Sequence, residues 1–286
     1  MAAIVDMALP LAHDKAEGQK RPGTLWLRVA SALVLAPIAT AAVWLGPPFL
    51  PALVLCAGVL MGWEWARLCG RNRIGLGGMV IIVAIAASVL AAALGATQLA
   101  LVILPLGSIV AFLLDRDDGE PLLAACGILW IGLPCVALVW LAGDARAGRM
   151  NVLWILAVVW ATDIGAYAVG RTLGGPRLAP RISPSKTWSG LLGGILCATA
   201  AGAAFALATD APAFSPLPLL SGVLAIVAQS GDLAESVAKR HFGVKDSSSL
   251  IPGHGGLLDR LDGMLTVIPA VALLNLVGGG SVVTWR

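Results

Sequence analysis

Charged residues are scarce in this sequence of 286 residues, at only 12%, whereas a soluble domain carries about 25%. So little polar material cannot cover a surface that faces water, and 58% of the residues are apolar. The composition therefore predicts an integral membrane protein, and it excludes a disordered chain, a disulfide scaffold and a coiled coil. The net charge is only +3, so no general basic field indicates nucleic-acid binding.

The sequence also lacks a redox pattern and a secretory signal. None of its five cysteines belongs to a Cys-x-x-Cys pair, so we expect buried, inert thiols. Residues 1–24 lack the ordered charged and apolar regions of a secretory signal, and we interpret them as a retained polar tail. The cysteines are Cys56, Cys69, Cys126, Cys135 and Cys197.

Long apolar runs fill the rest of the chain. A spanning helix needs about 20 mostly apolar residues, and nine runs qualify, which predicts an all-α bundle of about nine transmembrane helices. Continuous runs, rather than short alternating segments, exclude a β-barrel. We divide the chain into N-terminal helices over 25–148 and a C-terminal helical region over 149–286, whose polar loops we expect to carry the catalytic residues. The expected spans are Leu25–Leu45, Phe49–Leu68, Met79–Leu94, Thr97–Leu114, Pro121–Ala142, Asn151–Val169, Trp188–Ala208, Leu217–Lys239 and Met264–Gly280.

The basic residues favour one orientation of these spans. If the N-terminus is cytoplasmic, every Lys and Arg except Arg146, Arg149 and Arg286 falls on the cytoplasmic side, which is 16 of the 19. The positive-inside rule therefore predicts a cytoplasmic N-terminus and a C-terminus outside. Tryptophans near span ends are typical of interfacial anchors. They are Trp26, Trp44, Trp63, Trp65 and Trp188.

Two polar islands interrupt the apolar runs, both on the expected cytoplasmic side. The first begins at Asp163, inside the sixth span, where an unpaired carboxylate is costly and marks either a site or an ion pair. Tight turns follow, and then hydroxyls and an ammonium at the start of a helix, where free N–H groups favour an anion. These side chains are Ser183, Ser185, Lys186 and Thr187.

The second island is Ser236–Asp262. Its acids and the acids just before it are spaced three and four residues apart, so they share helical faces. Carboxylates suit a hard cation such as Mg²⁺, which commonly bridges them to substrate phosphates, while Lys and Arg neutralise phosphate charge. The island therefore predicts phosphoryl or nucleotidyl transfer. The main charged residues of the island and of the segment just before it are Asp232, Glu235, Lys239, Arg240, Lys245, Asp246, Asp259, Arg260 and Asp262.

The second island resembles the signature of the phosphatidate cytidylyltransferases, membrane enzymes that make CDP-diacylglycerol. Asp163–Tyr167 and Ser183–Gly190 are similar to two further elements of that family. The likeness is close from the first of these elements to the end of the second island, and it is only general in the first five helices. Three residues depart from the family pattern, namely Ile164, Ser189 and Ala238.

The resemblance implies a reaction in which the phosphate of phosphatidate attacks the α-phosphorus of CTP and pyrophosphate leaves. It implies Mg²⁺ held by Asp232 and Asp259, with Lys239 as a catalytic cation, and leaves open a second metal or a monovalent cation. His254 either contacts a phosphate or only shapes its glycine-rich turn. The residues expected to bind substrate are Asp163, Ser183, Ser185, Lys186, Thr187, Arg240, Lys245, Asp246, His254 and Arg260.

Two other functions stay open at this point. A cytidylyltransferase of the same family that uses a different lipid phosphate has the same motifs, because the sequence does not reveal the acyl pocket. A secondary transporter also carries acids in interrupted helices, but near the bilayer midplane and in repeated halves, whereas these acids gather at one face. As partners we expect CTP, phosphatidate and membrane lipid, with no nucleic acid. The resemblance also suggests a homodimer in a bacterial inner membrane.

Overall fold

The computed structural model describes residues 23–70, 73–115, 120–209, 211–212, 214–251 and 255–285, with only the backbone of 23–32. That part of the chain forms nine α-helices, a two-stranded hairpin and a 3₁₀ turn. The hairpin pairs β1 and β2 in antiparallel register. In chain order the elements are α1 (Gly23–Leu45), α2 (Phe49–Cys69), α3 (Leu76–Ala93), α4 (Thr97–Leu114), α5 (Pro121–Ala142), α6 (Gly148–Leu173), β1 (Arg177–Ala179), β2 (Ser183–Thr187), α7 (Trp188–Ala208), α8 (Leu217–His241), α9 (Leu258–Val277) and η2 (Val282–Thr284).

Each expected span corresponds to one helix. The helices α2 to α9 are long and apolar enough to cross a membrane, and in the described part of the chain α1 contributes the shorter apolar segment Leu33–Leu45. The chain is therefore a helical integral membrane protein. The last span begins at Leu258 rather than at Met264, because its first turn carries charged residues that a search for apolar runs passes over.

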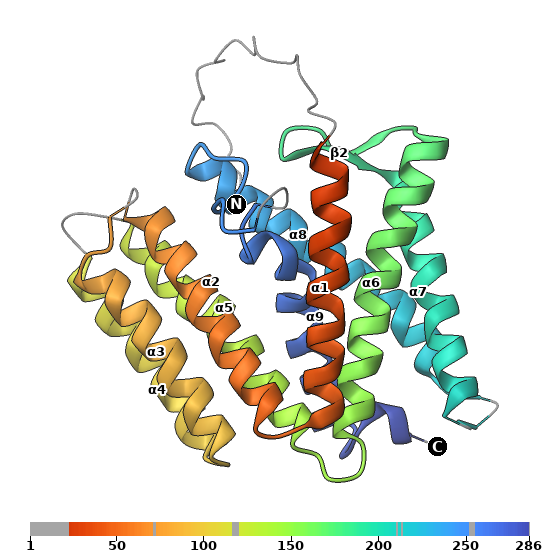
Figure 1. Ribbon diagram of the computed structural model, residues 1–286, viewed down its shortest axis with the longest axis horizontal. Coiled ribbons are helices and arrows are strands. Elements are labelled where there is room, and N and C mark those ends of the chain that lie inside the picture. Colours follow the sequence, from red (N-terminus) through yellow and green to blue (C-terminus); the bar gives the residue numbers. More distant parts are fainter. Residues whose placement is uncertain are drawn as a thin grey trace.

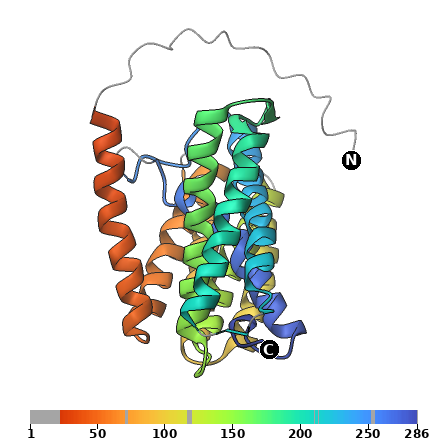
Figure 2. The ribbon, with the colours of Figure 1, turned by 90° about the vertical axis from the view of Figure 1, so that its right-hand side faces the viewer.

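Successive helices run in opposite directions, so the connections alternate between the two ends of the bundle (Figure 1). The hairpin and the C-terminal end of α8 lie at one end, and the C-terminus lies at the other. The helices α2 to α5 form one side of the molecule, α6 and α7 the other, and α8 and α9 lie between them. Figure 2 shows α1 along one flank of this bundle.

The contact between α6 and α7 depends on small residues. A methyl group added at Gly193 would enter the side chain of Val169 and come within 2.9 Å of the carbonyl oxygen of Gly165. At Gly194 it would lie 3.1 Å from the carbonyl oxygen of Thr162. These glycines therefore let the two backbones approach closely. The small-residue run of α7 serves packing inside the chain.

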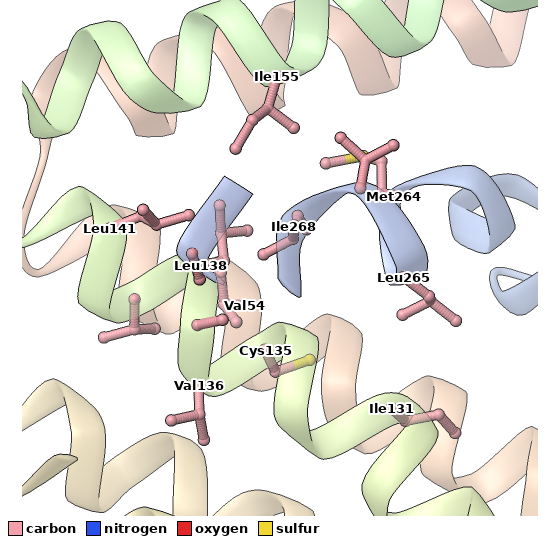
Figure 3. Packing of buried hydrophobic residues seen from close by; sticks show 14 of the residues in the cluster. Val54, Ile131, Cys135, Val136, Leu138, Leu141, Ile155, Met264, Leu265 and Ile268 are labelled. Atoms are coloured by element: carbon pink, nitrogen blue, oxygen red, sulfur yellow. The ribbon is translucent and has the colours of Figure 1, made fainter. Parts of the chain in front are cut away.

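A buried apolar cluster joins helices of the N-terminal part of the chain to helices of the C-terminal part (Figure 3). Val54 of α2 and Leu138 of α5 lie in the same cluster as Ile155 of α6 and Ile268 of α9. Because these four residues come from both predicted regions of the chain, the core links them, with α5 packed against both α2 and α9. That contact determines where the polar start of α9 lies.

Two predictions about side-chain placement are wrong. Cys56, Cys126 and Cys197 are exposed rather than buried, because an apolar thiol is as compatible with a lipid-facing surface as with a core. Trp65 is not an interfacial anchor, since it is only 5% exposed. Its indole N–H donates to the carbonyl oxygen of Leu123 at 2.9 Å, which ties α2 to the first turn of α5.

Candidate active site

A polar pocket of about 300 Å³ lies among α6, α8, the loop after α8 and the start of α9. Every residue that lines it is charged. The structure thus brings together side chains from both polar islands, although about 100 residues separate their outermost members. The lining residues are Asp163, Asp232, Lys239, Asp246, Asp259, Arg260 and Asp262.

Asp259 is the most firmly held carboxylate of the pocket. It is 8% exposed and lies in the first turn of α9, where the positive end of the helix dipole favours a negative charge. Its Oδ2 accepts hydrogen bonds from the backbone N–H groups of Ser247 and Gly256, both at 2.8 Å, and from the Ser247 hydroxyl at 3.0 Å. Its Oδ1 pairs with the Lys239 ammonium at 2.5 Å. The orientation of this carboxylate is therefore fixed on both sides.

Asp232 is paired in the same way by a different lysine. The ammonium of Lys186, on β2, lies 2.5 Å from Oδ2 of Asp232 and 2.8 Å from the amide oxygen of Gln229. Asp232 lies inside α8, because the helix continues to His241. Its carboxylate is about a third exposed and lines the polar pocket.

Lys239 lies between two buried acids. Besides Asp259, its ammonium contacts Oε1 of Glu235 at 3.3 Å, one helical turn earlier on α8. The Glu235 side chain is fully buried, and neither of its oxygens has a hydrogen-bond partner among the described residues. A buried carboxylate needs a counter-ion, so Lys239 stabilises two acids at once.

The predicted anion-binding hydroxyls lie on a β-hairpin and not at the start of a helix. Ser183–Thr187 form strand β2 rather than the start of a helix, and only Thr187 caps α7, where its Oγ1 accepts from the N–H of Gly190 at 3.0 Å. Arg240, at the end of α8, donates to the carbonyl oxygens of Ile182 and Val244. It therefore ties the hairpin to the loop after α8.

The remaining predicted site residues lie nearby or outside the described chain. Ser185 and Lys245 are exposed, Ser183 is partly exposed, and none of them lines the polar pocket. His254 lies outside the described residues.

Sequence reasoning missed Glu64, although its burial is as complete as that of any site residue. Glu64 lies in α2, is 1% exposed, and accepts hydrogen bonds from the loop that follows α8 and from the start of α9. The rule that singled out Asp163, that an acid inside a membrane span is costly and marks a site or a partner, applies equally to Glu64. An acid inside a predicted span was therefore the sequence feature that could have identified Glu64.

The donor set of the pocket fits a divalent cation. Five carboxylates line it against two cationic side chains, which leaves an excess of negative charge. No group of three or more acidic, histidine or cysteine side chains in the described residues forms a complete cage for an ion. Mg²⁺ needs only one or two carboxylates when phosphates and water supply its other ligands. The pocket thus suits a metal that is bound together with a nucleotide.

Comparison with known proteins identifies the family. The sequence model of the cytidylyltransferase family matches residues 26–277. The chain belongs to the cytidylyltransferase family. Phosphatidate cytidylyltransferase from Brucella suis biovar 1 (strain 1330) is 39% identical over 259 residues, which cover 89% of this chain and 93% of that protein. The enzyme of the same name from Pseudomonas aeruginosa is 36% identical, with 86% and 95% covered.

Family membership confirms the resemblance inferred from the two polar islands. A third relative, phosphatidate cytidylyltransferase from Bacillus subtilis (strain 168), is 44% identical over 128 residues, or 44% of this chain and 48% of that protein. Since the Brucella and Pseudomonas enzymes align over most of their length, the cytidylyltransferase assignment covers the whole bundle and not the motif alone.

Proposed function

We propose that this chain transfers the cytidylyl group of CTP to phosphatidate, giving CDP-diacylglycerol and pyrophosphate. Relatives named for this activity align with it nearly end to end, which supports the assignment. In the reaction an oxygen of the lipid phosphate forms a bond to the α-phosphorus of CTP. The bond from that phosphorus to the bridging oxygen of the β-phosphate breaks, and pyrophosphate leaves with the electron pair. No nucleophilic side chain is needed.

The observation that carries the lipid assignment is a second pocket beside the polar one. This apolar pocket has a volume of about 530 Å³ and lies between α1 and the helices α2, α5, α6 and α9. Its lining includes Leu35 and Ala39 of α1, Leu138 of α5 and, at one end, Asp163 and Arg260. The last two residues also line the polar pocket.

Two adjoining pockets of opposite character suit a substrate with a charged head and a hydrocarbon tail. Apolar walls accept acyl chains, whereas a buried phosphate needs charged or hydrogen-bonding partners. We therefore place the lipid phosphate near Arg260, at the wall that the two pockets share, and the acyl chains between α1 and the bundle. CTP occupies the polar pocket from the hairpin side.

We assign Asp232 and Asp259 as the carboxylates that hold Mg²⁺. When bound, this metal supplies neutralisation of the charge that develops on the phosphates and the departing pyrophosphate. Lys186 and Lys239, each 2.5 Å from one of these carboxylates, neutralise phosphate oxygens of CTP. Lys239 lines the polar pocket, and Lys186 lies at its edge through its ion pair with Asp232, which supports this role.

The other predicted contacts complete the nucleotide site in this proposal. Thr187 and the serines of β2 offer hydroxyls on the hairpin, and Arg240 and Lys245 offer cations at the end of α8 and in the loop after it. Asp246 lines the polar pocket from the same loop. A second metal and a homodimer stay predictions from the family resemblance.

We also propose that the polar pocket faces the cytoplasm of a bacterial cell. Among the described residues, the basic side chains gather at the end of the bundle that carries the hairpin, whereas Arg146 and Arg149 lie at the opposite end, where α6 begins. The positive-inside rule assigns the basic end to the cytoplasm. CTP reaches a pocket at that end directly from solution.

Incorporation of radioactive label from α-labelled CTP into lipid tests the function. The purified chain, in nanodiscs with Mg²⁺, should label lipid when phosphatidate is supplied and not when lipid phosphate is absent. Asp232→Asn should lower the rate by more than about 100-fold. Asp144→Asn is the matched control, since this exposed carboxylate caps backbone N–H groups at the opposite end of the bundle.

The outcomes separate the alternatives. Faster labelling of an isoprenoid ether lipid phosphate than of phosphatidate would replace the proposed substrate. No labelling of any lipid phosphate by well-folded protein would contradict cytidylyl transfer itself. Near-normal activity of Asp232→Asn would contradict the assignment of this carboxylate to the metal.

A further inference from the structure

Glu64 connects α2 to the loop between α8 and α9. Its Oε1 accepts hydrogen bonds from the Ser248 hydroxyl at 2.6 Å and from the N–H of Leu257 at 2.8 Å. Its Oε2 accepts from the N–H of Leu258 at 2.8 Å and from the Ser247 hydroxyl at 3.2 Å. All four donors lie 183 to 194 residues later in the chain. Both oxygens of one buried carboxylate are thus used to hold a single loop.

The start of α9 depends on this carboxylate. The first N–H groups of a helix have no partner inside the helix, and Leu257, at the N-cap position, provides no side-chain cap. Glu64 receives two of these N–H groups and places its charge at the positive end of the helix dipole. Gly256 makes the close approach possible, because a methyl group added there would lie 2.6 Å from Oε1 of Glu64.

The same loop holds the carboxylate of Asp259. The N–H groups of Ser247 and Gly256 both donate to Oδ2 of Asp259. The Ser247 hydroxyl lies within hydrogen-bond distance of Asp259 and of Glu64, so its single proton is shared by the two acids. Ser247 is itself 8% exposed. Glu64 and Asp259 therefore both accept hydrogen bonds from the same loop, which links the position of one carboxylate to that of the other.

We infer that Glu64 is a positioning residue for the metal-binding carboxylate. By fixing the loop and the first turn of α9, it turns Oδ2 of Asp259 toward the backbone and leaves Oδ1 facing Lys239 and the polar pocket. This inference rests on the proposed metal role of Asp259. Groups that orient a metal ligand typically change metal affinity or activity by about 10- to 100-fold when they are replaced.

Glu64→Gln is the decisive variant because it keeps the size of the side chain and removes one acceptor. One carboxylate oxygen becomes an NH₂ group that faces backbone N–H donors, so the loop loses part of its anchor. The Kd for Mn²⁺ of the full chain without CTP, measured by electron paramagnetic resonance, should rise about 10- to 100-fold. The Mg²⁺ concentration needed for half-maximal cytidylyl transfer should rise in parallel. The KM for CTP at saturating Mg²⁺ should stay the same.

Two further variants make the test independent of folding defects. Ser247→Ala removes only the hydroxyl that the two acids share and leaves the Ser247 N–H in place, so it should raise the Kd for Mn²⁺ by about 2- to 10-fold. Asp144→Asn makes the same acid-to-amide change at the far end of the bundle and should leave the Kd unchanged. Thermal unfolding without metal is measured for all three variants.

The result that would overturn the inference is a Kd for Mn²⁺ equal to that of the wild type in Glu64→Gln and Ser247→Ala, even if their unfolding temperatures fall. Glu64 would then stabilise the fold without orienting Asp259. Failure of the wild-type chain to bind Mn²⁺ would instead contradict the proposed metal role of Asp259, and it is distinguishable because it precedes any substitution.

Discussion

Replacing Lys239 with methionine tests whether this lysine acts on the substrate or only neutralises buried acids. Methionine keeps most of the length of the side chain and removes its charge. The ammonium lies 2.5 Å from Asp259 and 3.3 Å from Glu235, whose side chains are 4% and 0% exposed. The substitution therefore leaves two buried carboxylates without their shared counter-ion.

The loss of stability in Lys239→Met depends on the hydrogen bonds that Asp259 and Glu235 keep without the lysine. Asp259 keeps three hydrogen-bond donors on Oδ2, whereas Glu235 has no hydrogen-bond partner in the described part of the chain. Removal of one partner of a buried ion pair costs about 3–5 kcal/mol. We assign most of that loss to Glu235 and expect Lys239→Met to unfold at a temperature lower by about 6–20 °C, since each kcal/mol corresponds to about 2–4 °C.

A second substitution separates stability from catalysis. In Lys239→Met/Glu235→Gln the unpaired buried charge is gone, so the unfolding temperature should return most of the way to that of the wild type. Activity should not return, because a charge-assisted hydrogen bond to a phosphate contributes about 1.5–3 kcal/mol, or about 10- to 150-fold in kcat/KM. Thermal unfolding and label transfer from CTP are measured on the same preparations, with Glu235→Gln alone as the control. Recovery of both stability and activity in the double variant would refute a substrate role for Lys239.

Three further predictions concern the packing, the lipid pocket and the orientation. Gly193→Leu should lower the unfolding temperature by several degrees because its side chain enters α6, whereas Leu196→Ala on the exposed face of α7 should change it little; equal effects would contradict the close contact. Ala39→Trp, in the apolar pocket, should raise the KM for long-chain phosphatidate and leave the KM for CTP unchanged; a rise in both would argue against an acyl-chain role. Cysteines introduced at Arg177 and Ala145 should react with an impermeant reagent from the cytoplasmic and the outer side, respectively, and the reverse pattern would invert the proposed orientation.

The helices were largely predictable from the sequence because lipid imposes a simple requirement on them. Each span must hold about 20 apolar residues and satisfy its own backbone, so Thr97–Leu114, Pro121–Ala142 and Trp188–Ala208 have the bounds that the apolar runs predict. The start of α9 was not predictable in this way. Its first residues, Leu258 to Asp262, are ordered by partners elsewhere in the bundle, and no apolar pattern records those partners.

The site residues likewise fall into those that a local motif predicts and those that depend on contacts between distant parts of the chain. The motif around Asp232 and Asp259 spans a short stretch of sequence and could be recognised there, and the structure places both acids in one pocket. The hairpin was missed because Ser183–Thr187 contain serine and proline rather than the β-branched and aromatic residues that indicate strands. Glu64 was missed because its four donors lie far away in the sequence, and spacing along the chain carries no information about such a contact.

The carboxylate of Glu64 also imposes an order on biogenesis. Helix α2 leaves the ribosome nearly 200 residues before the loop that it anchors, so its acid enters the membrane without the N–H groups that later satisfy it. The last helix to insert supplies those groups. We therefore expect the nascent N-terminal half to depend on protection from lipid, and hybrid enzymes that join halves of different relatives to assemble only when this acid and its receiving loop are inherited as a matched pair.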